Sequence, residues 1–332
     1  MFENLIEILK ANPRKIVYTE GTDARILESA ARLKKGGFLT PILIGPVEEV
    51  KAVAANGDFD IDGLEILDPE TYPGMEEMVK TMVELRKGKM TEDECRALLQ
   101  KGNYFGTMLV KMGVADALLG GATYSTADTV RPALQIVKTR KGSNLVSSCF
   151  ILVRDDEMIC MGDCAINISY EDRKDKEGNV TLTAAEQLAE VAIATAGTAK
   201  VFGMDPKVAM LSYSTKGSGK GANVDLVRNA TAIVKEKAPD LAVDGEMQFD
   251  AAVSPVVGQL KFPGSKVAGY ANTFIFPEIQ SGNIGYKIAQ RLGGFAAYGP
   301  ILQGLNAPIN DLSRGCDADE VYTMSIITAA LV

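Results

Sequence analysis

The chain has 332 residues, of which 46% are hydrophobic, and a formal net charge of −8. At roughly 150 residues per domain, this length allows about two globular domains, each with its own core. Because the sequence contains no histidine, mechanisms that need a Ser-His-Asp or Cys-His arrangement are excluded, and a zinc site is disfavoured. The acidic balance, without a basic aromatic patch, argues against a nucleic-acid partner.

The cysteines and the N-terminal segment bear on the cellular compartment of the protein. The five cysteines are scattered and form no C-x-x-C pair, which fits free thiols better than disulfides. Residues 1–15 predict an acidic amphipathic helix rather than a signal peptide, and no run of about 18 apolar residues occurs. We therefore expect a cytoplasmic protein without a membrane span.

Strand and helix patterns alternate through the first part of the chain. Short apolar runs predict strands at 15–19, 40–46 and 116–121. Helical periodicity predicts helices over 24–35, 75–101 and 124–137, with a further capped segment at 91–94 inside the second range. The first of these helices has Thr22 or Asp23 as its N-cap, and the second contains Arg86. This order is typical of a parallel sheet in an α/β fold.

The second part repeats the alternation after a polar, turn-rich stretch at 138–145. Strands are predicted at 147–156, 157–167, 208–214, 241–246 and 266–276, the first two paired about a short Arg-Asp-Asp turn at 154–156. Helices are predicted after a capping box at Thr183 and Glu186, over 225–237 and 283–292, and at the C-terminus. The last helix is too apolar to stand alone, so we expect it to return to the first domain. The predicted domains are 1–142 with 303–332, and an inserted domain at 143–302.

The glycine loop TKGSGKG (215–221) follows a predicted strand and precedes a helix. Backbone amides freed by glycines next to a helix start can cradle phosphate oxygens. The loop matches neither the Walker A spacing nor G-x-G-x-x-G, so ATP and Rossmann-type NAD binding are disfavoured. It is either an anion-binding loop or an ordinary strand-to-helix turn.

Two further features have both a functional and a plain structural interpretation. In STADTVRP (125–132), Ser125 and Arg131 suit either an anion site or a helix cap with a surface ion pair. Asp244, Glu246 and Asp250 near a predicted strand end could hold a divalent metal, but such carboxylates more often cap or pair. Cys160 and Cys164, in an apolar segment, are expected to be buried structural thiols.

The stretch NAPINDLSRGCDADE (306–320) gathers a serine, an arginine and a cysteine among acidic side chains. Arg314 keeps its charge and can clamp a phosphoryl group or polarise a carbonyl. Ser313 can donate to a developing oxyanion, and carboxylates between 311 and 320 can accept a proton. Cys316 has no histidine to form its thiolate, so we do not expect it to be an acylated nucleophile.

Five segments, in order, closely resemble the phosphate acetyltransferases, or phosphotransacetylases, and the sister phosphate butyryltransferases. They are 106–135, 208–221, 243–253, 276–292 and NAPINDLSRGC at 306–316. The resemblance spans essentially the whole chain. It implies the reversible reaction of acetyl-CoA with phosphate to give acetyl phosphate and CoA. It also implies two three-layer α/β domains with an inter-domain active-site cleft, and a homodimer.

The resemblance also implies residue roles. It assigns Ser313 and Arg314 to catalysis, and Arg131 and Arg86 to the anionic parts of the substrates. The other expected contacts with CoA or phosphate are Ser125, Thr126, Lys216, Gly217, Ser218 and Cys316. Acetyl-CoA, CoA, acetyl phosphate and phosphate are the expected partners, with no permanently bound cofactor and no metal.

One departure from the family concerns the base. Counting without gaps, the family's catalytic aspartate falls on Glu320, which follows Asp319, so either carboxylate could serve. We expect a direct transfer in a ternary complex, in which this carboxylate takes the proton of the CoA thiol, of pKa roughly 8.5. The thiolate attacks the acetyl carbonyl, and Arg314 and Ser313 stabilise the charge that develops.

Other classes of protein remain alternatives. A phosphate butyryltransferase would differ only in the acyl chain. An NAD(P)-dependent hydroxyacid dehydrogenase of the isocitrate dehydrogenase type has a broadly similar two-domain architecture. A non-catalytic acyl-CoA-sensing module is a third possibility, which the intact DLSRGC segment disfavours.

Overall fold

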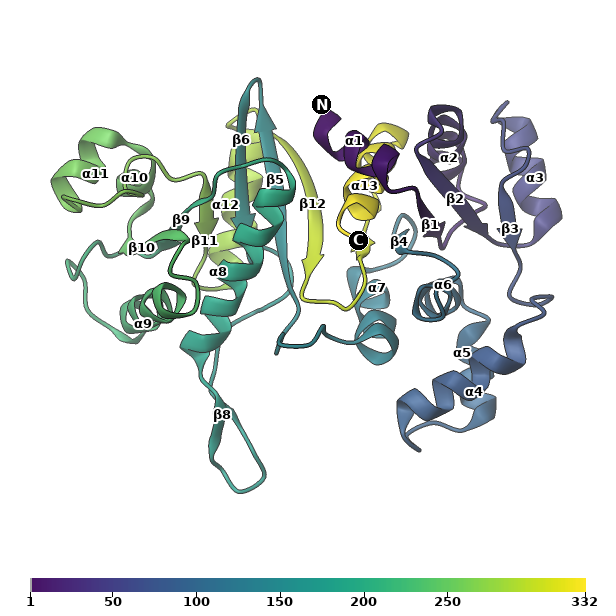
Figure 1. The fold of residues 1–332 in the computed structure, drawn as a ribbon, viewed down its shortest axis with the longest axis horizontal. Coiled ribbons are helices and arrows are strands. Elements are labelled where there is room, and N and C mark those ends of the chain that lie inside the picture. The colour runs from purple at the N-terminus through teal and green to yellow at the C-terminus, as the bar shows by residue number, and fades with distance from the viewer. Residues whose placement is uncertain (1) are drawn as a thin grey trace. The chain divides into compact units, whose positions relative to one another are not determined.

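The computed structural model describes residues 2–332, which fold into two compact units. One unit contains the chain up to Gly142 together with Leu305–Val332, and the other contains Ser143–Gly304. Each unit has a β-sheet between layers of helices, so the expected α/β class is confirmed (Figure 1). No helix within residues 2–332 is both long and apolar enough to cross a membrane.

The first unit is built on a parallel sheet with the strand order β13-β4-β1-β2-β3. Its strands are β1 (Arg14–Tyr18), β2 (Leu39–Ile44), β3 (Glu65–Leu67), β4 (Ala117–Gly120) and β13 (Ile309–Asp311). The central strand β1 pairs Tyr18 with Leu43 on one side and with Leu119 on the other. Because all five strands are parallel, the loops that follow them meet at one edge of the sheet.

Helices cover both faces of this sheet. They are α1 (Glu3–Ala11), α2 (Ala24–Gly36), α3 (Val47–Asn56), α4 (Met75–Arg86), α5 (Glu92–Leu99), α6 (Gly102–Lys111), α7 (Thr126–Pro132), the π-helical turn η1 (Ala133–Val137) and α13 (Ala318–Ala330). Val17 of β1 faces a core shared with α4, α5 and α6. The next residue, Tyr18, points the other way and donates to Ser325 of α13 at 2.6 Å. Strand alternation thus places the two halves of the core on opposite faces.

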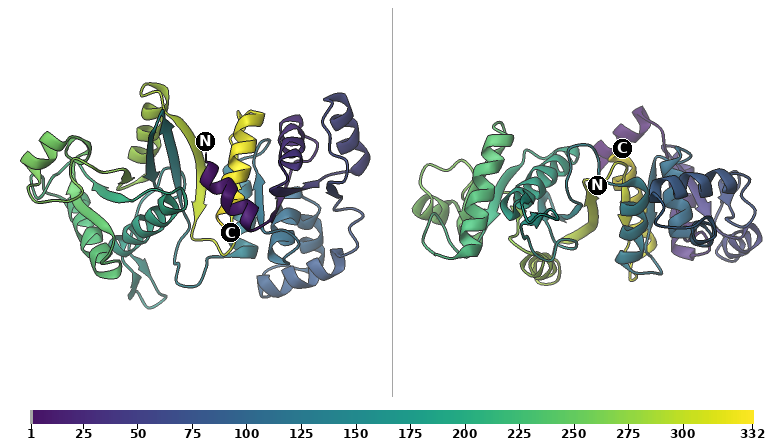
Figure 2. Two further views of the ribbon diagram at one scale, coloured as in Figure 1. Left: turned by 45° about the horizontal axis from the view of Figure 1, so that its top comes forward. Right: turned by 90° about the horizontal axis from the view of Figure 1, so that it is seen from below.

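The terminal helix α13 packs against α2, α1 and β4, as its apolar composition predicted. Figure 2 shows α1 and α13, at the two ends of the chain, side by side in both views. The helical pattern predicted over 75–101 forms two helices, and the second begins at the predicted capped segment. Lys87 adopts a left-handed conformation (φ 51°) that ends α4, and α5 then begins at a capping box formed by Thr91 and Glu94.

The second unit contains a mixed sheet with the order β10-β9-β11-β6-β5-β12. Its strands are β5 (Ser147–Arg154), β6 (Glu157–Gly162), β9 (Lys207–Leu211), β10 (Ala242–Met247), β11 (Thr273–Ile275) and β12 (Ala296–Gln303), with a separate pair β7 (Arg173–Lys174) and β8 (Val180–Leu182). The strands from β10 to β6 are parallel, whereas β5 pairs antiparallel with both β6 and β12. The predicted hairpin of β5 and β6 is confirmed.

The helices of the second unit are α8 (Ala184–Val201), α9 (Ala222–Lys237), α10 (Phe249–Val253), α11 (Pro255–Lys261) and α12 (Ile279–Arg291). Val208 and Met210 of β9 pack on the side of α8 and α9. Ala209 and Leu211 face the core that includes parts of α10 and α12. Several predicted boundaries are wrong. The strands expected over 266–276, 157–167 and 208–214 end up as the shorter Thr273–Ile275, Glu157–Gly162 and Lys207–Leu211. The helices α9 and α12 begin three and four residues earlier than predicted.

Candidate active site

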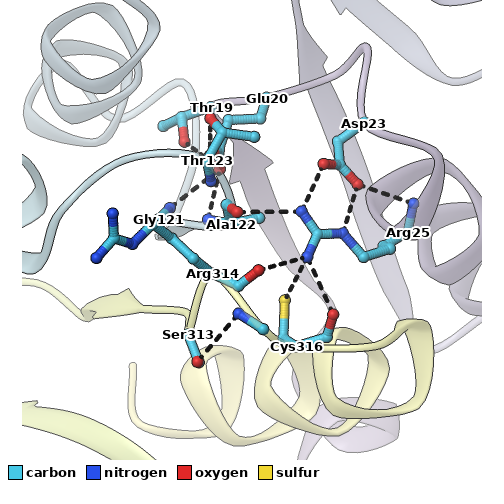
Figure 3. A network of polar contacts seen from close by, with 11 residues as sticks. Thr19, Glu20, Asp23, Arg25, Gly121, Ala122, Thr123, Ser313, Arg314 and Cys316 are labelled. Carbon is cyan, nitrogen blue, oxygen red and sulfur yellow. Dashed lines mark hydrogen bonds and ion pairs between the residues drawn. The ribbon is translucent and has the colours of Figure 1, made fainter.

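Ser313 and Arg314 lie in the loop between β13 and α13, at the carboxyl edge of the first sheet. The loop is a tight turn, in which the Cys316 amide donates to the Ser313 carbonyl at 3.0 Å. The Ser313 Oγ accepts from the Gly315 amide at 3.2 Å. Both side chains are exposed, and Figure 3 shows the Arg314 guanidinium directed away from the contacts that hold its backbone. A charged donor beside a hydroxyl is therefore presented to solvent.

Arg25 of α2 holds this turn in place. Its guanidinium forms an ion pair with Asp23, with the shorter contact at 2.7 Å, which holds the pKa of Asp23 below its usual value. The same group donates to the carbonyls of Arg314 and Cys316, each at 3.0 Å, and to the carbonyl of Ala122 at 3.0 Å (Figure 3). One side chain therefore connects the loops that follow β13 and β4.

Glu20 fixes the loop after β4 from another direction. Its carboxylate accepts the amides of Gly121, Ala122 and Thr123, at 3.0, 3.3 and 2.6 Å (Figure 3). The Thr123 hydroxyl adds a further hydrogen bond at 2.7 Å. Successive amides that converge in this way form an anion-binding nest. In this protein, the nest is filled by the protein's own carboxylate.

The two candidate bases lie in very different surroundings. The Asp319 side chain is 82% exposed and pairs with Arg32 at 2.6 Å. Glu320 is half-buried, and burial, aided by the nearby Asp317 carboxylate, raises the pKa of its carboxyl. A carboxylate with a raised pKa is the stronger proton acceptor. Burial and the direction of this pKa shift favour Glu320 over Asp319 as the base, whose role stays a prediction.

Cys316 is buried beside Arg25, whose guanidinium lies 3.7 Å from its sulfur. Burial nevertheless raises the pKa of the thiol to about 11, against the effect of Arg25. The thiol is thus protonated at neutral pH and is a poor nucleophile. This agrees with the expectation that Cys316 is not acylated.

Replacing Cys316 by alanine should leave substantial activity. The thiol is protonated and lies buried beside Arg25. We expect kcat to fall by less than about fivefold, because deleting a buried thiol mainly loosens the local packing. Steady-state kinetics with both substrates varied checks this. A trapped acetyl-thioester on Cys316, or ping-pong kinetics, would contradict it.

Replacing Arg25 by lysine should impair catalysis more than folding. A lysine keeps the charge but cannot donate to three carbonyls and an aspartate at once. The turn that presents Arg314 would shift, and small displacements of this kind lower turnover on the order of tenfold to a hundredfold. The measurement is kcat together with the melting temperature. Arg32→Lys on the same helix is the matched control and should remain within about twofold; an Arg25→Lys variant with wild-type kcat would refute the role.

The other predicted residues of the first unit are also placed by the structure. The Ser125 hydroxyl donates to Asp128 at 2.7 Å and the Thr126 hydroxyl to Asp311 at 2.5 Å, so both hydroxyl protons are engaged within the protein. Burial raises the pKa of the Tyr104 hydroxyl, and the charges of Arg131 and Arg86 oppose this rise. The two predicted arginines therefore lie near one tyrosine.

Arg86 and Arg131 differ in exposure. Arg131 is exposed, on the last turn of α7. The Nε of Arg86 is buried and has no hydrogen-bond partner within the part of the chain that the structure describes. A buried, unsatisfied donor is costly unless a ligand or water pairs with it. Both observations are compatible with the predicted binding of an anionic group, which stays a prediction.

In the second unit, the loop 215–221 is folded around a buried glutamate. The amide of Gly217 donates to Glu246 at 2.6 Å, and the amide of Gly219 donates to the Ser214 hydroxyl at 2.9 Å. Two of the amides expected to cradle a phosphate are therefore engaged inside the protein. Lys216 is exposed and lies over the Phe262 ring at 5.1 Å, and the Ser218 hydroxyl accepts from the Thr215 amide.

The carboxylates considered for a metal each have other partners. Asp244 pairs with Lys235 at 2.6 Å, and Asp250 pairs with Lys261 at 2.7 Å. Glu246 accepts from Ser214 at 2.9 Å. Within residues 2–332, the structure contains no group of three or more carboxylates or thiols arranged to hold a metal. Cys160 and Cys164 are buried free thiols, as predicted.

The sequence analysis counted Asp311 among the carboxylates that could accept a proton, but Asp311 is 2% exposed and accepts hydrogen bonds from Thr126 and Thr129, so it is not available as that base. Sequence reasoning missed Glu20 and Arg25. Both lie nearly 300 residues before the turn at 313–316, so no local pattern connects them with it. A weak signal was available in E-G-T-D-A-R directly after a predicted strand. Polar residues that follow neighbouring parallel strands meet at one edge of a sheet, so this segment and DLSRG were candidates to lie together.

The model of the phosphate acetyl/butaryl transferase family matches residues 1–329. The chain belongs to this family. It is 51% identical to the phosphate acetyltransferase of Bacillus subtilis (strain 168) over 330 residues, which cover 99% of this chain and 98% of the relative. It is 50% identical to the phosphate acetyltransferase of Staphylococcus aureus (strain Mu50 / ATCC 700699) over 95% of this chain and 94% of that one.

A solved structure leads to the same family. The crystal structure of a phosphotransacetylase from Streptococcus pyogenes superimposes with a TM-score of 0.93 at 51% identity, covering 99% of this chain and 97% of that one.

Proposed function

We propose that this chain is a phosphate acetyltransferase, which transfers an acetyl group reversibly between CoA and inorganic phosphate. The observation that carries the proposal is the exposed pair Ser313 and Arg314, in a chain that matches this family over residues 1–329. Glu320, a carboxyl group of raised pKa, follows on the first turn of α13. CoA and acetyl-CoA act as substrates rather than bound cofactors.

With acetyl phosphate as the acyl donor, the Glu320 carboxylate takes the proton of the CoA thiol. The thiolate forms a bond to the acetyl carbon, and the charge on the tetrahedral oxygen is stabilised by Arg314 and Ser313. The bond between the acetyl carbon and the phosphate oxygen then breaks, which gives acetyl-CoA and phosphate. The proton on Glu320 leaves with phosphate or water. The reverse direction uses the same groups.

Five residues of the first unit are proposed to hold the substrates. Arg131 of α7 and Arg86 of α4, which lie near Tyr104, suit the phosphates of CoA. Ser125 and Thr126, at the start of α7, remain proposed contacts, as does Cys316. In the second unit, Lys216 with Gly217 and Ser218 remains a proposed contact for an anionic group, supported mainly by the exposed ammonium of Lys216.

The test is the release of free CoA thiol from acetyl-CoA, with and without phosphate, repeated with butyryl-CoA. We expect release only with phosphate, and faster with acetyl-CoA than with butyryl-CoA, because relatives about half identical in sequence are named phosphate acetyltransferases. A preference for butyryl-CoA would make the chain a phosphate butyryltransferase. Reduction of NAD(P) with a hydroxyacid, without thiol release, would indicate a dehydrogenase instead.

We also propose a cytoplasmic homodimer. The cytoplasm is supported by five buried free cysteines, which fit a reducing compartment. The dimer is supported by the exposed apolar side chains of the second unit, which we take as its apolar surface: Phe249, Val253, Val256, Leu260, Tyr270, Ile284, Ile288 and Leu292. Three of these line one hollow with Phe274 and Phe295, and such a patch marks an interaction site.

The shape of this surface fits a second copy of the chain. It combines a concave part, lined by aromatic rings, with the protruding α11, whose Val256 and Leu260 are 78% and 79% exposed. A two-fold dimer requires both complementary parts on the same surface.

Replacing Leu260 by arginine should weaken the dimer. A charge placed in the centre of an apolar interface is costly to bury. Light scattering during gel filtration should give twice the chain mass of 35.5 kDa for the wild type, and a lower mass for the variant at micromolar concentration. Ile8→Arg on the first unit is the control, since Ile8 is exposed but lies outside this surface. A wild type that elutes as a monomer would refute the proposal.

A further inference from the structure

Asp311, the last residue of β13, is a buried carboxylate without a cation. It is 2% exposed, and within residues 2–332 no lysine or arginine forms an ion pair with it. Burying a charge in this way is unfavourable, and an apolar residue would often give a more stable core. Stability alone therefore does not account for an aspartate at this position.

The partners of Asp311 are two threonine hydroxyls from one helix. Thr126 donates to Oδ2 at 2.5 Å and Thr129 to Oδ1 at 2.6 Å. The two residues are three apart on α7, so both hydroxyls lie on the same face of that helix. Each oxygen of the carboxylate thus accepts a hydrogen bond from α7.

The backbone beside Asp311 leaves room for its carboxylate. Gly121 lies at the end of β4, next to the pairing of Asp311 with Gly120. A side chain at Gly121 would collide with Oδ1 of Asp311, and the φ of +102° at this glycine is itself one that other residues rarely adopt. The Leu312 amide donates to the Gly120 carbonyl at 2.7 Å and continues the strand pairing into the turn.

Asp311 and Thr129 each lie two residues before a residue with a proposed role in the reaction. Ser313 follows Asp311 by two residues, and Arg131 follows Thr129 by two residues. The hydrogen bonds of Asp311 therefore join the segment that presents the proposed catalytic pair to the helix that carries a proposed CoA-binding arginine. Neither Asp311 nor Thr129 is accessible to a substrate, because they are 2% and 1% exposed.

We propose that Asp311 is a positioning residue that couples α7 to the Ser313–Arg314 turn through Thr126 and Thr129. This inference rests on the proposed function for its kinetic consequences. The two hydrogen bonds that form the coupling belong to the fold and do not depend on the activity. When it is lost, both the presentation of Arg314 and the placement of Arg131 should suffer, although neither residue is altered.

The principal test is Thr129→Val, which removes one hydroxyl and keeps the shape of the side chain. We expect kcat to fall on the order of tenfold and the KM for CoA to rise several-fold, because small displacements of positioned groups are costly to catalysis. Thr129→Ser, which restores the hydroxyl, should recover most of the activity. Thr107→Val is the matched control, since Thr107 is equally buried but donates within its own helix to Asn103.

A second measurement separates this inference from the proposed function. Hydrogen exchange, followed by mass spectrometry on the full chain, should show faster exchange over residues 312–317 in Thr129→Val, and no change there in Thr107→Val. This readout does not depend on activity, so a wild type without transferase activity would refute the proposed function and leave the coupling testable. Unchanged exchange in the turn, or unchanged kcat and KM with only a lower melting temperature, would overturn the inference.

Discussion

Replacing Arg314 by glutamine is expected to lower turnover by about a hundredfold to a thousandfold, the usual cost of removing one donor to a developing oxyanion. The guanidinium is exposed, and its backbone is already held by Arg25, so the side chain has no evident role in folding. Glutamine retains an amide donor but is shorter and carries no charge. The effect should therefore appear in kcat, with the melting temperature close to that of the wild type.

The control for this variant is Arg314→Lys, which restores the charge but not the planar fork. We expect it to recover part of the lost turnover, since charge and geometry both contribute. An Arg314→Gln enzyme that retains more than about a tenth of the wild-type kcat would remove Arg314 from the mechanism.

The second large loss of turnover is expected when Glu320 is replaced, and not when Asp319 is replaced. Glu320→Gln removes the proposed base, and general base catalysis usually contributes on the order of a hundredfold or more. Asp319→Asn breaks only an exposed ion pair with Arg32, and such pairs contribute little. We expect kcat to fall at least about a hundredfold in the first variant and less than about threefold in the second.

The pH dependence follows from the raised pKa of Glu320. The base must be ionised to accept the thiol proton, so activity should fall as the pH decreases through this pKa, which lies above the ordinary value of about 4.3. The acid limb should persist in Asp319→Asn and disappear from the residual activity of Glu320→Gln. Glu320→Asp is the conservative variant and should retain more activity than Glu320→Gln. A reversed order, with Asp319→Asn the more damaging change, would exchange the two roles.

The fold could be predicted wherever hydrophobic periodicity was strong. The apolar runs of β1, β2 and β4 and the capped helices α2 and α8 were predicted within one or two residues at most ends, because burial and capping are local signals. The strand β13 could not be predicted in this way. Its Asn310 and Asp311 are polar yet buried, and they are stabilised by hydrogen bonds to Thr328 and to Thr126 and Thr129, which are far away in sequence.

The candidate site was predictable only in part, for the same reason. Ser313 and Arg314 stand together in one segment, so their proximity was evident before the structure. The choice between Asp319 and Glu320 depended on which of two successive helical positions faces inward. Glu20 and Arg25 could be placed at the site only once the order of the strands was known. That order brings the ends of β1, β4 and β13 together at one edge of the sheet.

The most direct test of the proposed activity is phosphorus NMR of the purified protein mixed with acetyl-CoA and inorganic phosphate. We predict that the acetyl phosphate signal grows in a one-to-one ratio with free CoA thiol for the wild type, and that it is nearly absent for Arg314→Gln. Thiol release without acetyl phosphate, or equal formation of acetyl phosphate by the variant, would contradict this account of the site.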